Sequence, residues 1–207
     1  PIRQRSFPSQ QYGSLEQIIA EFLAEGAERP TTGAFAVAGP VLMGTAGQDF
    51  GEYRAWLEAA GVDTSLVVQV PDKFTASFFC STDQANNQIA SFYTGAMAHA
   101  SELSFRTAGD VDLVVISPND PRAMTQYAEE CRTMGIDFIF DPGQQCARMS
   151  GDELKAGIDG AAIVICNDYE SELIREKTGF DEQAVLERAA MYVITRGEHG
   201  STVLTPD

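Results

Sequence analysis

The sequence predicts an α/β fold with a parallel sheet that helices cover on both faces. Strand-like and helix-like segments alternate through the second half of the chain, which is the rhythm of successive βαβ units. The strand-like segments are continuous apolar runs, as expected for parallel strands buried on both faces. Each run ends in a polar stretch rich in Gly, Asn or Asp, and an open α/β sheet binds ligands at such strand ends. These stretches begin at Ser117, Asp141, Asn167 and Thr195.

The elements of the second half have recognisable start and stop signals. Asp120 and Pro121 predict the start of a helix, because Asp caps helices and Pro suits the first helical position. Gly135 predicts the end of that helix. Ser150 and Glu153 have the spacing of a capping box and predict a further helix. We expect strands at 112–117, 136–140, 161–166, 191–195 and 201–204, and helices at 121–134, 154–158, 170–177 and 181–190.

The first hundred residues depart from this rhythm. We expect a helix over residues 14–25, a strand over 34–38 and a second helix that ends at Gly61. Side chains at helical spacing place Tyr53, Trp56, Leu57 and Ala60 on one face of the second helix. Two β-rich segments around a polar turn, 74–83 and 88–94, predict a β-ribbon that forms a lid or a small subdomain.

The charge and composition exclude several classes of function. The chain has 207 residues and a net charge of −16, which disfavours broad contact with nucleic acid or anionic lipid. No apolar run approaches the roughly 18 residues that a membrane-spanning helix needs, and the first residues show no signal peptide. The cysteines are widely spaced and predict reduced thiols in a cytoplasmic protein; they are Cys80, Cys131, Cys146 and Cys166.

Two polar stretches at strand ends are candidate ligand sites. Asn167 and Glu170 lie where a buried strand passes into a helix, a position that could hold Mg²⁺ against phosphate or could simply cap the helix. In the stretch Thr195–Ser201, two glycines would let a nucleotide approach the backbone and Arg196 could neutralise phosphate. The alternative for that stretch is an ordinary glycine hairpin. His99 and His199 lack metal-ligand spacing and are interpreted as structural.

In combination, several short stretches resemble the PfkB (ribokinase-like) family of sugar and nucleoside kinases. The resemblance covers residues 41 to 207, and the adenosine-kinase-like branch is the most similar. Single stretches are weak signals, but their order and spacing together are fairly specific. The matching stretches are 44–51, 57–64, 92–96, 140–143, 167–170 and 195–200.

The resemblance implies a ribokinase-like, doubly wound α/β domain with a small β lid, here at about residues 66–96. It implies ATP-dependent phosphorylation of a sugar or nucleoside hydroxyl, with ATP and Mg²⁺ as cofactors. The family's NxxE motif organises Mg²⁺ and phosphate, a role that carries to Asn167 and Glu170. The family's nucleotide loop carries to Thr195, Gly197 and Gly200. Lids of this family often pair between subunits, so a homodimer through the lid is also implied.

Two family motifs are absent from the 207 residues. The GxGD motif, whose Asp deprotonates the accepting hydroxyl, does not occur, so no residue of the chain is assigned as the catalytic base and turnover is expected to be lost. The early Gly-Gly substrate motif is also missing. In its place, 1–41 resembles the N-terminal region of bacterial glucokinase. We therefore expect a glucokinase-like segment, 1–41, followed by a partial kinase domain, 42–207, in a domain incomplete at both ends, as in a chimera.

Two alternative functions stay open at this point. The first is a non-catalytic module that binds nucleotide or dimerises through the remaining lid and sheet. The second is a relative of glucokinase, which would require glucose-dependent turnover. No glucokinase motif follows Val41, which argues against the second alternative.

Overall fold

The computed structural model describes residues 2–7, 40–82, 84 and 88–206. The chain forms two compact units that divide between Ser104 and Phe105, and strand β1 (Ile2–Phe7) belongs with the C-terminal unit. The helix expected over 14–25 and the strand expected over 34–38 lie outside the described residues. None of the described helices has the length and apolar character needed to cross a membrane.

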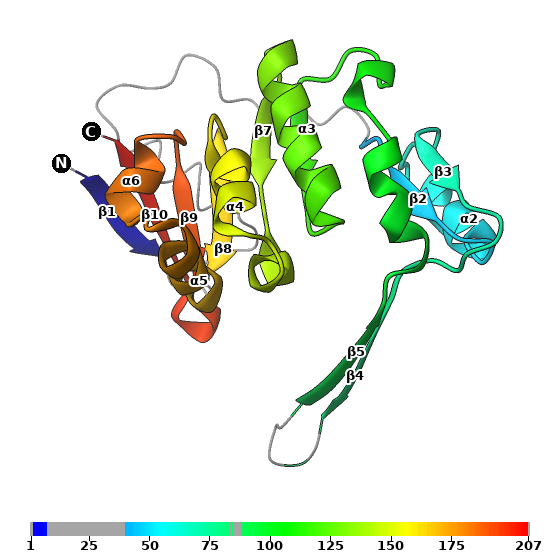
Figure 1. Cartoon of the computed structure of the whole chain (residues 1–207), viewed down its shortest axis with the longest axis horizontal. Coiled ribbons are helices and arrows are strands. Elements are labelled where there is room, and N and C mark those ends of the chain that lie inside the picture. The colour runs from blue at the N-terminus through cyan, green and yellow to red at the C-terminus, as the bar shows by residue number, and fades with distance from the viewer. Residues whose placement is uncertain (1, 8–39, 83, 85–87, 207) are drawn as a thin grey trace. The chain divides into compact units, whose positions relative to one another are not determined.

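The larger unit contains a six-stranded, mostly parallel sheet (Figure 1). Its strand order is β1-β10-β9-β8-β7-β6. The four parallel strands are β6 (Leu113–Ile116), β7 (Asp137–Phe140), β8 (Ile163–Asn167) and β9 (Tyr192–Thr195). Strand β10 (Ser201–Pro206) runs antiparallel to β9, because a connection of five residues is too short for the crossover that a parallel pair needs. Strand β1, which the sequence did not predict, pairs antiparallel with β10.

Helices of this unit lie on one face of the sheet. They are α3 (Pro121–Met134), α4 (Gly151–Ile158), α5 (Asp168–Thr178) and α6 (Glu182–Leu186). The parallel strands follow one another in chain order, so successive right-handed crossovers place α3, α4 and α5 side by side (Figure 1). The predicted α/β class with a parallel sheet is confirmed. Helical cover on the second face is not seen among the described residues. On that face Val115 is 58% exposed, whereas Val193 and Val203 are fully buried in a second core cluster.

The main core lies between this sheet and its helices. Alternate strand residues such as Phe138, Phe140 and Ile194 are buried beneath the helices. Gly157 of α4 lies directly over the Phe140 ring, and a Cβ atom there would meet Cζ of Phe140 at 2.1 Å. The absence of a side chain at Gly157 therefore sets how closely α4 approaches β7.

Local signals in the sequence correctly located the helix ends of this unit. The Asp120 carboxylate accepts a hydrogen bond from the Arg122 backbone N–H at 3.0 Å, with Pro121 in the first turn. Ser150 and Glu153 form the predicted capping box. Gly135 ends α3 with φ +70°, a left-handed conformation that favours glycine. The helix expected over 181–190 is shorter, because α6 ends at Leu186.

The smaller unit combines a two-stranded parallel sheet with a separate antiparallel ribbon. The parallel pair is β2 (Gly44–Ala46) and β3 (Val67–Gln69), and α2 (Gly51–Ala59) connects them. The ribbon is β4 (Ser77–Thr82) with β5 (Gln88–Tyr93), which confirms the predicted ribbon, and it extends well away from β2 and β3 (Figure 1). Two 3₁₀ helices, Gly95–Glu102 and Phe105–Thr107, follow, the second already in the larger unit.

The apolar face of α2 is buried only at Leu57, and the rest of it is exposed. Leu57 is buried and packs with Phe50 and Val67, but Trp56 is 62% exposed and Tyr53 is also exposed. The rings of Tyr53 and Trp56 stack on each other, with centroids 5.5 Å apart. Their spacing on the helix reflects this mutual contact rather than contact with the core.

Gly157→Ala tests the close approach of α4 to β7. The new methyl group would overlap a Phe140 ring that has no room to move, so we expect a loss of about 1–3 kcal/mol and several degrees in melting temperature. Differential scanning calorimetry measures this change. Gly51→Ala, at the start of α2, has no atom within 4 Å of its Cβ position and should cost nothing. Equal destabilisation by both changes would contradict the packing account.

Candidate functional site

The carboxyl ends of the parallel strands bring three of the polar stretches to one edge of the sheet. The β8–β9 register pairs Asn167 with Thr195. The Asp141 backbone N–H, just after β7, donates to the Ile116 carbonyl of β6 at 2.9 Å. Segments far apart in the sequence, at Asp141, Asn167 and Thr195, therefore end at the same edge. This edge is our candidate site.

Asn167 and Glu170 form a reciprocal capping box at the start of α5. The Glu170 backbone N–H donates to Oδ1 of Asn167 at 2.8 Å, and the Asn167 backbone N–H donates to Oε2 of Glu170 at 2.8 Å. Both side chains are half-buried. The structure therefore shows the helix-capping geometry for these two residues. The capping hydrogen bonds hold the Glu170 carboxylate in one orientation at the strand end.

Asp141 lies next to this capping box and was missed as a candidate by sequence reasoning. Burial raises the pKa of its carboxyl, the charge of Glu170 raises it further, and the Gly143 backbone N–H partly offsets both. Gly143 has φ +46°, and a Cβ atom there would lie 2.6 Å from Cγ of Pro118. The signal that could have identified Asp141 was its position, directly after a buried strand and before Pro-Gly.

Asp141 and Glu170 are neighbouring carboxylates at this edge. The charge of Glu170 raises the pKa of Asp141, as expected for two carboxylates that lie near each other. Within the described residues, no three His, Cys, Asp or Glu side chains gather into a group that could hold a metal ion. A set of two carboxylates suits Mg²⁺ only where phosphate oxygens and water complete the coordination.

The hairpin between β9 and β10 carries the remaining candidate residues. The Arg196 backbone N–H donates to the Gly200 carbonyl at 2.7 Å and closes the turn. Gly197 and Gly200 have φ +54° and +86°, and no atom lies within 4 Å of a Cβ position at Gly197. The glycine-hairpin alternative is therefore the geometry observed, and it leaves the backbone at Gly197 open to a ligand.

The side chains of Thr195 and Arg196 each make a hydrogen bond within the sheet and hairpin. Oγ1 of Thr195 donates to the Cys166 carbonyl at 3.4 Å, which ties β9 to β8. Nε of Arg196 donates to Oγ1 of Thr202 at 3.1 Å, while the side chain stays exposed. Arg196 therefore presents a positive charge in the hairpin that follows the acidic capping box.

The two histidines and the four cysteines take no part in this arrangement. His99 lies in the smaller unit and its Nδ1 is 2.8 Å from Oε1 of Glu102, whereas His199 is exposed in the hairpin. All four cysteines are free. Burial raises the pKa of both Cys146 and Cys166 to about 12, so these thiols are protonated at neutral pH.

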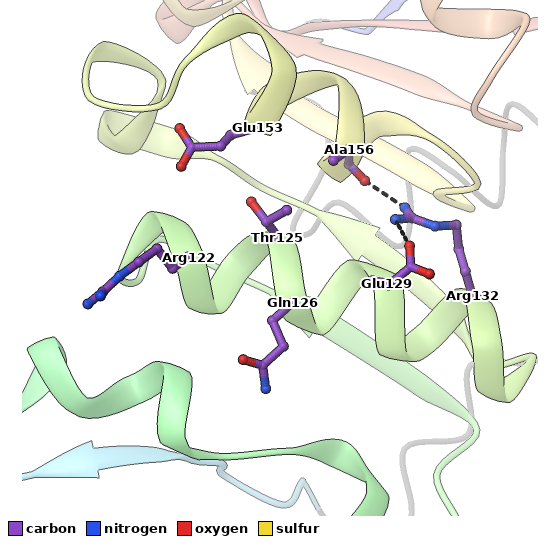
Figure 2. A pocket seen from close by; sticks show the side chains of 7 residues that line it. All are labelled: Arg122, Thr125, Gln126, Glu129, Arg132, Glu153 and Ala156. Carbon is purple, nitrogen blue, oxygen red and sulfur yellow. Dashed lines mark hydrogen bonds and ion pairs between the residues drawn. The ribbon is translucent and has the colours of Figure 1, made fainter.

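A surface cavity lies elsewhere, in the groove between α3 and α4 (Figure 2). It has a volume of about 470 Å³ and is lined by side chains such as Thr125 and Glu153. Arg132 borders it, and its guanidinium donates to the Ala156 carbonyl and to Glu129, each at 2.6 Å. None of the residues at the strand ends lines this groove, so it is separate from the candidate site.

Comparison with known families gives a match over most of the chain. A family model described as pfkB family carbohydrate kinase matches residues 34–207. The match begins before the predicted boundary at residue 41. The resemblance of 1–41 to glucokinase, and the boundary itself, stay predictions.

Several of the similar proteins are nucleoside kinases. A nucleoside kinase of Methanothermobacter thermautotrophicus is 30% identical over 171 residues, which are 80% of this chain and 55% of that protein. The structure of Burkholderia thailandensis nucleoside kinase in complex with inosine is 37% identical, with a TM-score of 0.73 over 78% of this chain and 53% of that one. The Methanocaldococcus jannaschii nucleoside kinase structure, of the ribokinase family, is 27% identical with a TM-score of 0.74, over 82% and 56%. The chain spans about half the length of these relatives.

Asp141→Asn tests the electrostatic strain at the strand ends. Because the pKa of Asp141 is raised in the folded state, the folded chain holds this proton more tightly than the unfolded chain. Its contribution to stability is therefore lost as pH rises above 3.8 through the raised pKa. The variant lacks this loss, so at pH 7 we expect it to melt at a higher temperature than the wild type.

Urea titrations at pH 3.5, 5 and 7 measure this difference. The advantage of Asp141→Asn over the wild type should grow with pH. Asp137→Asn, at the exposed start of the same strand, should show no such trend. An Asp141→Asn variant that is less stable than the wild type at pH 7 would show that the charge is stabilised, contrary to this account.

Proposed function

The chain belongs to the pfkB family of carbohydrate kinases, and from this premise we propose that it carries the nucleotide-binding part of a nucleoside kinase. Such an enzyme transfers the γ-phosphoryl group of ATP to a hydroxyl of a nucleoside. The observation that carries the proposal is the β8–β9 register, which pairs Asn167 with Thr195. That register brings the NxxE capping box and the glycine hairpin to the same edge of the sheet. The nucleoside kinases among the relatives favour a nucleoside over a simple sugar as the acceptor.

The charges at the site favour a nucleotide that arrives with a cation. A bare phosphate would meet three carboxylates at this edge, those of Asp141, Asp168 and Glu170. Two backbone N–H groups in the first turn of α5 are already occupied, since Tyr169 donates to Oδ1 of Asp168 and Glu170 donates to Oδ1 of Asn167. The start of α5 is therefore a poor site for a free anion, despite its helix dipole.

Magnesium is the cation that this donor set fits. Mg²⁺ usually binds through one or two carboxylates and otherwise keeps water and substrate phosphates as ligands. Asn167 and Glu170 would organise the ion, with Asp141 beside them. When bound, the ion would neutralise charge on the phosphates. The capping box holds Glu170 in place before any ligand arrives.

The hairpin after β9 would bind the nucleotide itself. The open backbone at Gly197 allows a flat base or a ribose to approach, and Gly200 permits the turn that exposes it. Thr195 lies beside Asn167 and would reach the phosphate side of the nucleotide. Arg196 would balance phosphate charge, since its guanidinium is exposed and held at one nitrogen only.

Binding and turnover are separate parts of the proposal. Phosphoryl transfer depends on positioning and charge stabilisation, and a base adds about 10²–10⁴-fold. The 207 residues contain no GxGD sequence, which would supply the base. We therefore expect a polypeptide of these residues to bind Mg·nucleotide with little or no turnover.

The ribbon of the smaller unit favours a second role, the pairing of two copies. The β4–β5 register puts Phe79 and Ile89 on one face and Phe78 and Phe92 on the other. Phe79 is 67% exposed and Ile89 is 80% exposed. A ribbon with large apolar side chains on both faces has two surfaces to cover. We propose that the Phe79–Ile89 face pairs with a second copy and that the opposite face covers the nucleoside.

Glu170→Gln tests the proposed Mg·nucleotide site. Glutamine can still accept the capping hydrogen bond, so the helix start is preserved while the negative charge is lost. We expect the affinity for Mg·ADP to fall at least about tenfold. Isothermal titration calorimetry of the 207-residue chain, with and without Mg²⁺, measures this affinity.

Glu176→Gln is the matched control for this measurement. Glu176 lies on the same helix and is exposed, so its loss should leave the affinity unchanged. Mg·ADP binding that is equal in the wild type and Glu170→Gln would exclude the proposed role. An affinity for ADP that does not depend on Mg²⁺ would also count against it.

Phe79→Ser tests the pairing of two copies. A buried phenylalanine side chain contributes about 1.5–3 kcal/mol, so the dimer should weaken about tenfold or more. Size-exclusion chromatography with light scattering measures the mass against concentration. Phe78→Ser makes the same chemical change on the opposite face and should leave the mass unchanged. A wild-type chain that stays monomeric at every concentration would exclude this role.

A further inference from the structure

We propose that Lys177 is a positioning residue that fixes the spacing of the Asp141 and Glu170 carboxylates. It lies at the far end of α5, outside every motif that the sequence analysis identified. The inference rests on the proposed function, because its purpose is to hold the proposed Mg·nucleotide site in shape.

The ammonium group of Lys177 is shared among three backbone carbonyls. Its Nζ donates to the carbonyl oxygens of Cys146 at 2.7 Å, Ala147 at 2.9 Å and Met149 at 2.8 Å. An ammonium group has three donors, so these contacts use all of them. In the described part of the chain, no carboxylate lies within ion-pair distance of it. The charge of Lys177 therefore acts on one backbone segment.

The segment that Lys177 holds begins at the candidate site. Asp141 is followed by a short 3₁₀ helix, η4 (Gly143–Ala147), which packs against α5. The Gly143 N–H bonds to the Asp141 carboxylate at one end of this segment, and Lys177 binds its other end. This segment is thus bonded to the candidate site at its start and to α5 at its end.

Helix α5 also connects the candidate site with the far end of this segment. Glu170 lies in its first turn and Lys177 in its last, and the capping box fixes the first turn to β8. At the far end, a Cβ atom on Gly151 would lie 2.2 Å from the Lys177 carbonyl oxygen, so the start of α4 also lies against this turn. The segment after Asp141 and helix α5 are thus connected at both ends. Loss of the Lys177 contacts would release the segment from the end of α5 and let Asp141 move relative to Glu170.

The energetics favour a strong effect for one side chain. The end of a 3₁₀ helix leaves carbonyl groups without backbone partners, and a cation is the best side-chain donor for them. Hydrogen bonds from an ionised donor are roughly twice as strong as neutral ones. Methionine at this position would fill similar space but would leave three carbonyls without the donor.

The test uses two substitutions and one control in the full 207-residue chain. Lys177→Met removes the donors, and Lys177→Arg keeps the charge and several donors. Lys155→Met makes the same change at a lysine of α4, whose ammonium group lies 3.9 Å from Asp152 and 5.6 Å from the centre of the Phe180 ring and binds no backbone carbonyl among the described contacts. If Lys177→Met proves unfolded by circular dichroism, Lys177→Gln takes its place.

The first readout is amide hydrogen exchange, which needs no ligand. In Lys177→Met we expect exchange at residues 143–149 to accelerate at least about tenfold relative to the strands of the sheet. Lys177→Arg should restore most of the protection, and Lys155→Met should leave it unchanged. Uniform acceleration across the whole unit in Lys177→Met would overturn the proposal, because it would show a general loss of stability.

The second readout is the affinity for Mg·ADP, measured by calorimetry. We expect about a tenfold loss in Lys177→Met, recovery in Lys177→Arg and no change in Lys155→Met. Local acceleration of exchange with unchanged affinity would overturn the positioning role. A wild-type chain that does not bind Mg·ADP would refute the proposed function, and the exchange data alone would then decide whether Lys177 holds the segment.

Discussion

The pair of hydrogen bonds between Asn167 and Glu170 is the constraint on which the rest of the site depends. It satisfies two backbone N–H groups at the start of α5 and ties that helix to the end of β8. It also places a carboxylate at the positive end of the helix dipole, where a negative charge is favoured. The charge of this carboxylate raises the pKa of Asp141, and Thr195 is the register partner of Asn167. The same contacts that stabilise the fold thus give the strand ends their acidic character.

Local features of the fold could be predicted from the sequence because neighbouring residues determine them. Asp120, Ser150 and Asn167 each accept a hydrogen bond from a backbone N–H two or three residues further on. Such contacts depend on a few residues in one stretch, so the spacing of these residues in the sequence predicts the helix start. The ribbon was predictable for the same reason, since its strands are joined by a short polar turn.

Features that depend on distant parts of the chain could not be predicted in this way. The pairing of β1 with β10 joins the two ends of the described chain. Trp56 has the spacing of a core residue but stacks on Tyr53 in solvent, and periodicity does not show what a helix face meets. Asp141 and Lys177 act through contacts with segments about thirty residues away. The six candidate residues were found because they belong to two motifs, whereas Lys177 lies outside every motif and Asp141 lies in a matching stretch to which no role was assigned.

The shape of the ribbon has a thermodynamic consequence. A two-stranded ribbon with six residues in each strand is marginally stable by itself in water. Whatever covers one of its faces therefore also bears the entropic cost of ordering both strands. A second molecule that binds the other face meets strands that are already ordered, and it binds more tightly for that reason. The two faces are coupled through order alone, with positive cooperativity that needs no change in the average structure.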